Sequence, residues 1–153
     1  MAVQIRIDNT TIPFIKSGTS YVRNMTIAQD AARTVDLLQN TVMAYHVVNQ
    51  NWVPFIVLNG NEGESVPQAI YLGDDIPFAD LVDGDIEDAE IMTGGSCTVD
   101  ESLVVWDQNL QTSASVVPAA AANPIFVITA AACLKLFGIF FEDTEDISEL
   151  ENT

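Results

Sequence analysis

The sequence predicts an α+β fold: a small β-rich domain, built as a mixed sheet or partial barrel, with one short C-terminal helix and an extended N-terminal arm. Short β-branched and aromatic segments recur between Gly, Asn and Pro residues, which is typical of strands joined by turns. One Ala- and Leu-rich segment near the C-terminus ends at a glycine, which is typical of a helix. A chain of 153 residues fits one domain with its own core.

The first 21 residues are predicted to form the extended arm. Val3, Ile5 and Ile7 alternate with polar residues, which is the period-2 pattern of a strand. Residues 9–20 are rich in Thr, Ser and Gly, which favours an extended linker. An alternating strand outside the core can add to the exposed sheet edge of a partner, so the arm is a candidate binding segment.

The predicted domain spans residues 22–142 and consists mainly of strands. The segment 41–48 is the most strand-like, and 49–51 is expected to form a hairpin turn, because Asn tolerates positive φ. Residues 31–40 are compatible with either a helical turn or a loop. Strands are predicted at 22–28, 41–48, 52–58, 68–72, 89–93 and 101–106. Pro54 marks an edge or a bulge, and Pro67 marks the start of a strand. Gly94–Gly95 is expected to form a turn, and residues 108–123 a surface loop.

The C-terminal part is predicted to form a helix, a short strand at 138–141 and an acidic tail at 143–153. The helix begins either at Pro124 or after Thr129 as its N-cap, and it ends before Gly138. The rival interpretation is a membrane span. A helix over 124–137 would rise only about 21 Å, whereas a hydrocarbon core needs about 30 Å, so a buried helix is favoured.

The charge distribution limits the classes of partner. The formal net charge is −17, and four of the five Lys and Arg residues lie within the first 33 positions. A body this acidic repels nucleic acid and anionic membrane surfaces, because both are bound through clustered cations. We therefore expect neither nucleic acid nor a membrane as a partner.

No pattern in the sequence indicates catalysis or a bound cofactor. His46 is the single histidine, and in a strand it is expected to be packed and hydrogen-bonded. The acidic segment 74–90 lacks the spacing of an EF-hand loop, so a solvated loop is favoured over a Ca²⁺ site. Cys97 and Cys133 have no metal or redox spacing, which favours free thiols and the cytosol as the place of synthesis. We expect no enzyme, no cofactor and no metal.

Two short motifs resemble the head decoration proteins of tailed bacteriophages, the lambda-type capsid-stabilising family. The first is Gly63, Ser65, Pro67, Ile70 and Leu72 followed by Asp74–Asp75, with Glu64 inserted after the glycine. The second is "LKLFGIF", containing Leu134, Phe137, Gly138, Ile139 and Phe140. The resemblance covers about residues 22–141. The long loop 108–123 and the apolar stretch 124–128 depart from the family pattern.

The resemblance implies a structural virion protein, made in the host cytoplasm. Such a protein forms a homotrimer, binds the major capsid protein on the outer surface of the capsid, and stabilises the shell against the pressure of packaged DNA. It also implies that the arm orders on the capsid. The residues expected to bind there are the apolar and cationic side chains of the arm: Val3, Ile5, Arg6, Ile7, Ile12, Phe14 and Lys16.

The sequence is also compatible with three different functions. The same module could form the base of a capsid head fibre. It could instead be a small membrane-linked β domain, or a domain that binds a small ligand or Ca²⁺.

Overall fold

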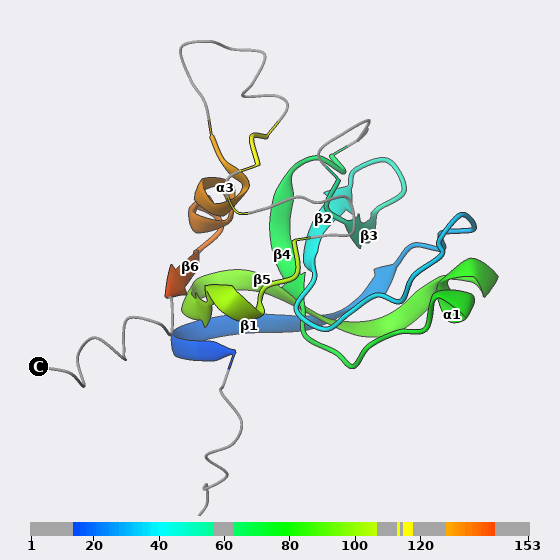
Figure 1. Cartoon of the computed structure of the whole chain (residues 1–153), viewed down its shortest axis with the longest axis horizontal. Helices are drawn as coiled ribbons and strands as arrows, with labels where there is room; N and C mark the ends of the chain where they lie inside the picture. The colour runs from blue at the N-terminus through cyan, green and yellow to red at the C-terminus, as the bar shows by residue number, and fades with distance from the viewer. Residues whose placement is uncertain (1–13, 57–62, 107–112, 114, 118–127, 143–153) are drawn as a thin grey trace, which may run out of the picture.

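The computed structural model describes residues 14–56, 63–106, 113, 115–117 and 128–142. Five strands close into a mixed barrel in the order β1-β3-β2-β4-β5, with β5 pairing back on β1, and β6 extends the sheet beyond β5 (Figure 1). The prediction of a small β-rich domain with a short helix is confirmed. The strands are β1 (Ile15–Ile27), β2 (Val42–His46), β3 (Asn51–Pro54), β4 (Pro67–Tyr71), β5 (Ile86–Asp100) and β6 (Ile139–Glu142), and the helices are α1 (Phe78–Asp83) and α3 (Ala130–Leu136).

The strand β1 is longer than predicted and overlaps the predicted arm. It pairs antiparallel with β5 from Ile15↔Val99 to Ile27↔Ile86, with register shifts along the way. The boundary between arm and domain at residues 21 and 22 is therefore wrong, because residues 15–21 belong to the barrel. The segment is polar and mostly exposed, so its strand conformation comes from pairing with β5 and not from an apolar pattern.

The central strands β2, β4 and β5 are buried on both faces. One face of these strands joins an inner cluster with Ile27 of β1 and Trp52 of β3, which fills the barrel. The opposite face joins an outer cluster beneath α3 and β6. Double burial explains why β2 and β4 consist mostly of apolar residues, whereas β5 also contains exposed polar residues outside its buried positions. The inner face presents Met43, Ala69, Tyr71 and Ile91, and the outer face presents Val42, Ala44, Ile70 and Met92.

The helix α3 begins after Thr129, at one of the two predicted starts. The Thr129 hydroxyl accepts a hydrogen bond from the Ala132 N–H at 3.2 Å, which caps the first turn. The other candidate start, Pro124, lies outside the described residues. Lys135 lies in the last turn, and β6 follows in parallel pairing with β5. None of the described helices has the length and hydropathy of a membrane span.

Two predictions for the segment around β5 are wrong. Gly94 and Gly95 form no turn but lie inside β5, both with positive φ. A Cβ on Gly95 would overlap the Thr19 carbonyl, and one on Gly94 would overlap the Phe137 carbonyl, so these glycines let three backbones approach closely. Residues 101–106 form no strand but begin with a 3₁₀ turn over Glu101–Leu103.

The acidic segment 74–90 is more ordered than a solvated loop. It contains the short helix α1, and Leu81 of this helix enters the inner cluster. Residues 31–40 form a loop, as one of the two interpretations predicts, and Leu37 of this loop bridges to Ile76. In the turn between β2 and β3, the residue with positive φ is Gln50 and not an asparagine.

Candidate functional site

Most of the predicted arm residues lie outside the described part of the chain. These are Val3, Ile5, Arg6, Ile7 and Ile12. Phe14 and Lys16 are described, and both belong to the domain. Phe14 packs against the outer cluster, and its carbonyl accepts the Asp100 N–H at 2.8 Å. The arm as predicted is therefore too long at its C-terminal end.

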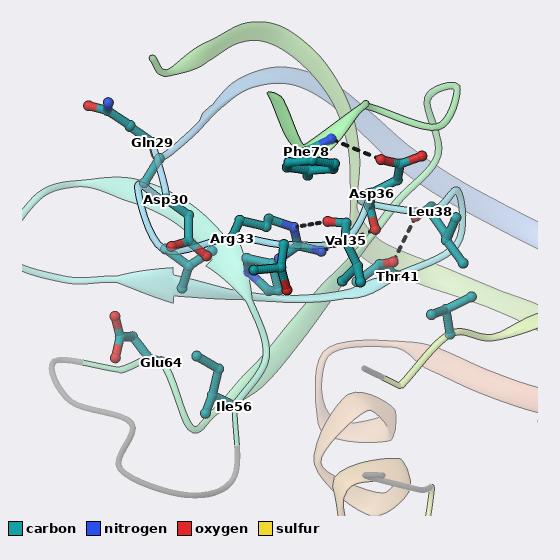
Figure 2. Close-up of a pocket in the computed structure, with 15 residues that line it drawn as sticks. Gln29, Asp30, Arg33, Val35, Asp36, Leu38, Thr41, Ile56, Glu64 and Phe78 are labelled. Carbon is teal, nitrogen blue, oxygen red and sulfur yellow. Dashed lines mark hydrogen bonds between the residues drawn. The ribbon is translucent and has the colours of Figure 1, made fainter. Parts of the chain in front are cut away.

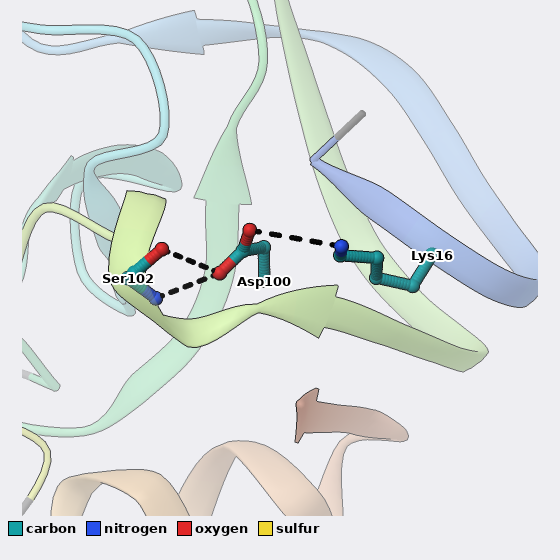
Figure 3. A network of polar contacts seen from close by, with 3 residues as sticks. All are labelled: Lys16, Asp100 and Ser102. Atoms are coloured by element: carbon teal, nitrogen blue, oxygen red, sulfur yellow. Dashed lines mark hydrogen bonds and ion pairs between the residues drawn. The ribbon is translucent and has the colours of Figure 1, made fainter. Parts of the chain in front are cut away.

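Lys16 is part of an internal ion pair and is not a free cation. Its ammonium lies 3.9 Å from Asp100 Oδ2, and the Asp100 side chain is fully buried (Figure 3). The other carboxylate oxygen of Asp100 accepts hydrogen bonds from the Ser102 N–H at 3.0 Å and the Ser102 hydroxyl at 2.6 Å. This Asp100 junction joins the start of β1 to the end of β5. The prediction that Lys16 contacts a partner is thus not supported by its place in the fold.

The motif residues that carry the family resemblance lie in the core or beside it. Ile70, Leu134 and Ile139 share the outer cluster, and Leu72 packs against it. The Pro67 carbonyl lies 3.5 Å from the Cys133 thiol, which links the start of β4 to α3. Gly63 and Ser65 lie in the turn before β4, and Gly138 lies between α3 and β6. The two motifs, far apart in the sequence, therefore form one packed unit.

An open groove lies where the barrel wall is weakest. Within the described residues β1 pairs with β3 at a single position, Ile27↔Trp52, and then turns away. Beside this point, the loop that follows β1 and the end of β3 border a cavity of about 700 Å³, which we call the seam groove (Figure 2). Its walls are the loop 28–38, the segment 53–56 and the first residue of α1. Pro54 ends β3 and borders this groove, whereas β3 itself lies between β1 and β2 and is not an edge strand.

The wall of the seam groove presents apolar side chains to solvent. Val35, Leu38 and Phe78 are each about two-fifths exposed, although they are large and apolar. Val53, Ile56 and Val105 complete the apolar lining. Single exposed apolar side chains need no explanation, but a group of them around one hollow is typical of a binding surface.

Hydrogen bonds hold the groove wall in place. The Asp30 N–H donates to the Leu81 carbonyl at 2.9 Å, and Leu37 and Ile76 exchange two backbone hydrogen bonds. The Asp36 carboxylate accepts the Phe78 N–H at 2.9 Å, which fixes the start of α1 against the loop. These hydrogen bonds fix the backbone of the loop against α1 and the segment before it. The apolar side chains of the loop are therefore held in exposed positions.

The charged residues of the seam groove are mainly acidic. Asp30, Asp36 and Glu64 line it, together with one cation, Arg33. The Arg33 guanidinium donates to the carbonyls of Val35 at 2.9 Å and Asp36 at 3.4 Å. Three carboxylates against one guanidinium leave the lining with a formal charge of −3 + 1 = −2, so the field at the groove is negative.

The titratable residues elsewhere make structural contacts. His46 Nδ1 accepts the Asn49 N–H at 3.2 Å, and its Nε2 lies 3.9 Å from Glu64 Oε1. Cys97 and Cys133 are buried free thiols, and burial raises the pKa of both. Burial and the neighbouring Asp74 also raise the pKa of Tyr71, whose hydroxyl donates to the Asp74 carbonyl. Among the described residues, no three His, Cys, Asp or Glu side chains are grouped as metal ligands.

Comparison with known proteins identifies no homologue of this chain. No family model matches the chain, and no curated protein matches its sequence significantly. The sequence does not predict the seam groove. Val35 and Leu38 lie in a segment that also contains Ala31, Ala32 and Leu37 and that is compatible with a helical turn, so nothing in the pattern sets the pair apart as exposed.

Proposed function

We propose that this chain is a structural virion protein, a decoration protein that binds the outside of a tailed-phage capsid as a homotrimer and stabilises the shell. The observation that carries the proposal is the packing of the two motif segments. Ile70 of the first motif and Leu134 and Ile139 of the second meet in one core cluster, although more than 60 positions separate them. Residues that resemble one family at two distant places are thus parts of a single folding unit.

The surface chemistry supports a binding role. The net charge of −17 keeps the body away from nucleic acid, which is compatible with a position outside the shell. Large apolar side chains are exposed at the seam groove, and also at Leu136 of α3, at Phe137 and at Phe140 of β6. Apolar groups of this kind gain stability when a partner covers them.

The N-terminal segment is proposed to contribute to capsid binding. With β1 beginning at Ile15, the candidate binding residues are those before Phe14, with Arg6 as their cation. An alternating segment that orders on a sheet edge gains main-chain hydrogen bonds and apolar burial, and loses conformational entropy at that moment.

Co-sedimentation tests the proposal. The purified chain is mixed with expanded capsids assembled from the major capsid protein of the same genome. We expect saturable binding and greater resistance of the capsids to heat. Removing residues 2–12 should weaken binding at least tenfold, or about 1.4 kcal/mol, with an unchanged melting temperature. Absence of binding by the full chain contradicts the proposed function, and equal binding by the shortened chain contradicts the role of the arm.

Analytical ultracentrifugation tests the trimer. We expect a trimer in solution or on the shell. A chain that stays monomeric at high concentration and also binds capsids as isolated monomers contradicts this part of the proposal.

A further inference from the structure

We propose that the seam groove is a peptide-binding site, and that its occupant is a short segment of the partner protein carrying Lys or Arg between apolar side chains. The identification of that partner as a capsid subunit rests on the proposed function. The existence and chemistry of the site rest on the groove alone.

The size and lining of the groove fit side chains from a partner. Its volume of about 700 Å³ falls within the range of about 300–1,000 Å³ found for ligand sites. Val35, Leu38 and Phe78 stand around it, partly exposed. A partner segment that inserts apolar side chains removes these three from water, which is the main source of favourable free energy.

The shape of the groove is fixed before any partner arrives. The Leu37–Ile76 backbone pair, the Asp36–Phe78 contact and the Asp30–Leu81 contact each tie the groove wall to α1 or to the segment before it. Gln39 adds two further hydrogen bonds, to Asp75 Oδ1 at 2.8 Å and to the Leu72 carbonyl at 2.8 Å. A preformed site loses little conformational entropy on binding.

The charges of the groove select a cationic occupant. The groove is lined by three carboxylates, those of Asp30, Asp36 and Glu64, and by one guanidinium, that of Arg33, so the formal charge of the lining is −3 + 1 = −2. A Lys or Arg of the occupant would be attracted to these carboxylates, and an acidic segment would be repelled.

The same charges disfavour the folded body of a second copy. The chain carries −17, so two bodies docked through an acidic groove bring like charges together. Among the described cations outside the groove, Lys16 is paired with Asp100, which leaves Arg23 and Lys135. A basic segment of a different protein therefore fits better than the folded body of a second copy.

Pro54 indicates that side chains provide most of the contact. It forms part of the groove edge of β3 and has no N–H, so that edge offers one donor fewer for pairing with an added strand. Specificity should therefore depend on the apolar and cationic side chains of the occupant and less on its backbone.

A peptide titration of the full chain tests the site without capsids. The probe is a capped, fluorescein-labelled Val-Lys-Val-Lys-Val peptide, and the comparison peptide carries Glu in place of Lys. We expect saturable binding of the Lys peptide, with NMR shifts at Val35, Leu38 and Phe78, and at least tenfold weaker binding of the Glu peptide. Equal affinity for both peptides, or shifts confined to other surfaces, would overturn the proposal.

Paired variants distinguish binding at the groove from non-specific binding to exposed apolar side chains elsewhere. The double variant Val35→Ser/Leu38→Ser removes exposed apolar groups from the groove, and Val47→Ser/Val48→Ser removes exposed apolar groups, 54% and 64% accessible, from the turn after β2. We expect the first to weaken peptide binding at least tenfold and the second to leave it unchanged. Asp30→Asn/Glu64→Gln should weaken binding of the Lys peptide and reduce its salt dependence. Unchanged binding by the groove variant contradicts the proposal.

A cross-linking experiment identifies the natural occupant. A photoreactive residue at position 38 is compared with one at position 47 on decorated capsids. We expect position 38 to cross-link to a capsid segment with Lys or Arg beside apolar residues. A cross-link to another copy of this chain would overturn the assigned partner. If the chain binds no capsid while the Lys peptide still binds the groove, the proposed function fails and the peptide site stands.

Discussion

The two ends of β1 are held very differently. At its N-terminal end, Ile15 and Ser17 pair with β5, β6 lies on the other side of β5, and the Asp100 junction connects the strands. At its C-terminal end, Ile27 pairs with Ile86 of β5 and makes the single pair of β1 with β3, to Trp52, and the chain that follows borders the seam groove. Near the first end, Phe14 and Ile15 pack against the outer cluster, whereas Val35, Leu38 and Phe78 around the groove at the second end are each about two-fifths exposed.

The difference shows how the surroundings of one strand can be closed at one end and open at the other. The β1–β5 pairing is the longest wall of the barrel, although register shifts interrupt it at three places. A wall that closes through one pair leaves room for a hollow without disturbing the rest of the core. The loop 28–38 then fills part of the gap and presents Val35 and Leu38 to solvent.

The largest expected effect concerns the closed wall. Gly95→Val places a side chain where the Thr19 carbonyl lies and at a positive φ, so backbone strain and overpacking should together lower the free energy of unfolding by about 4 kcal/mol. The matched control is Gly84→Val, because nothing lies within 4 Å of a Cβ there and its backbone is extended. Urea denaturation measures both. Equal stabilities would show that the close approach of β1 to β5 is unimportant.

Two adjacent leucines, one in the core and one in the groove, test whether the groove wall contributes to stability. Leu37 is fully buried in the inner cluster, whereas Leu38 is 44% exposed in the groove. Leu37→Ala should lower the free energy of unfolding by about 3 kcal/mol through the cavity it leaves. Leu38→Ala should change it by less than about 0.5 kcal/mol. If Leu38→Ala is as destabilising as Leu37→Ala, the groove wall is part of the core and not a surface kept for a partner.

Strands and helices are predicted correctly from the sequence where their burial produces a recognisable pattern of apolar residues. The strands β2 and β4 are recognisable because both faces are buried and their apolar residues run together, and α3 is recognisable through Thr129 and Gly138. The first half of β1 was missed because its polar residues pair with β5 without an apolar pattern. Gly94–Gly95 was assigned to a turn because glycines that permit close backbone approach look the same in sequence as glycines that turn the chain. The seam groove depends on where β1 leaves β3, which no local pattern records.

The smallest expected effect concerns the Asp100 junction at the other end of β1. Lys16 Nζ lies 3.9 Å from Asp100 Oδ2, which is too long for a strong hydrogen bond, so the contact is mainly Coulombic. Breaking a fully buried pair costs about 3–5 kcal/mol, and exposed pairs contribute about 0–1 kcal/mol. Lys16 is 16% exposed, so Lys16→Met should fall between these limits, near 1–2 kcal/mol, because it leaves a buried carboxylate without its cation.

The matched control for this change is Arg23→Met, on the exposed part of the same strand. Both variants remove one cation from an acidic chain, so the added repulsion between carboxylates is nearly the same, and their difference reports the local pair. Hydrogen exchange should also quicken at Ile15 and Ser17 in Lys16→Met alone, because the start of β1 loses a tie to β5. Adding Asp100→Asn to Lys16→Met should recover part of the lost stability, since the buried charge is gone while an oxygen remains to accept from Ser102. Equal destabilisation by Lys16→Met and Arg23→Met, with no recovery in the double variant, would mean that the start of β1 is held by strand pairing alone.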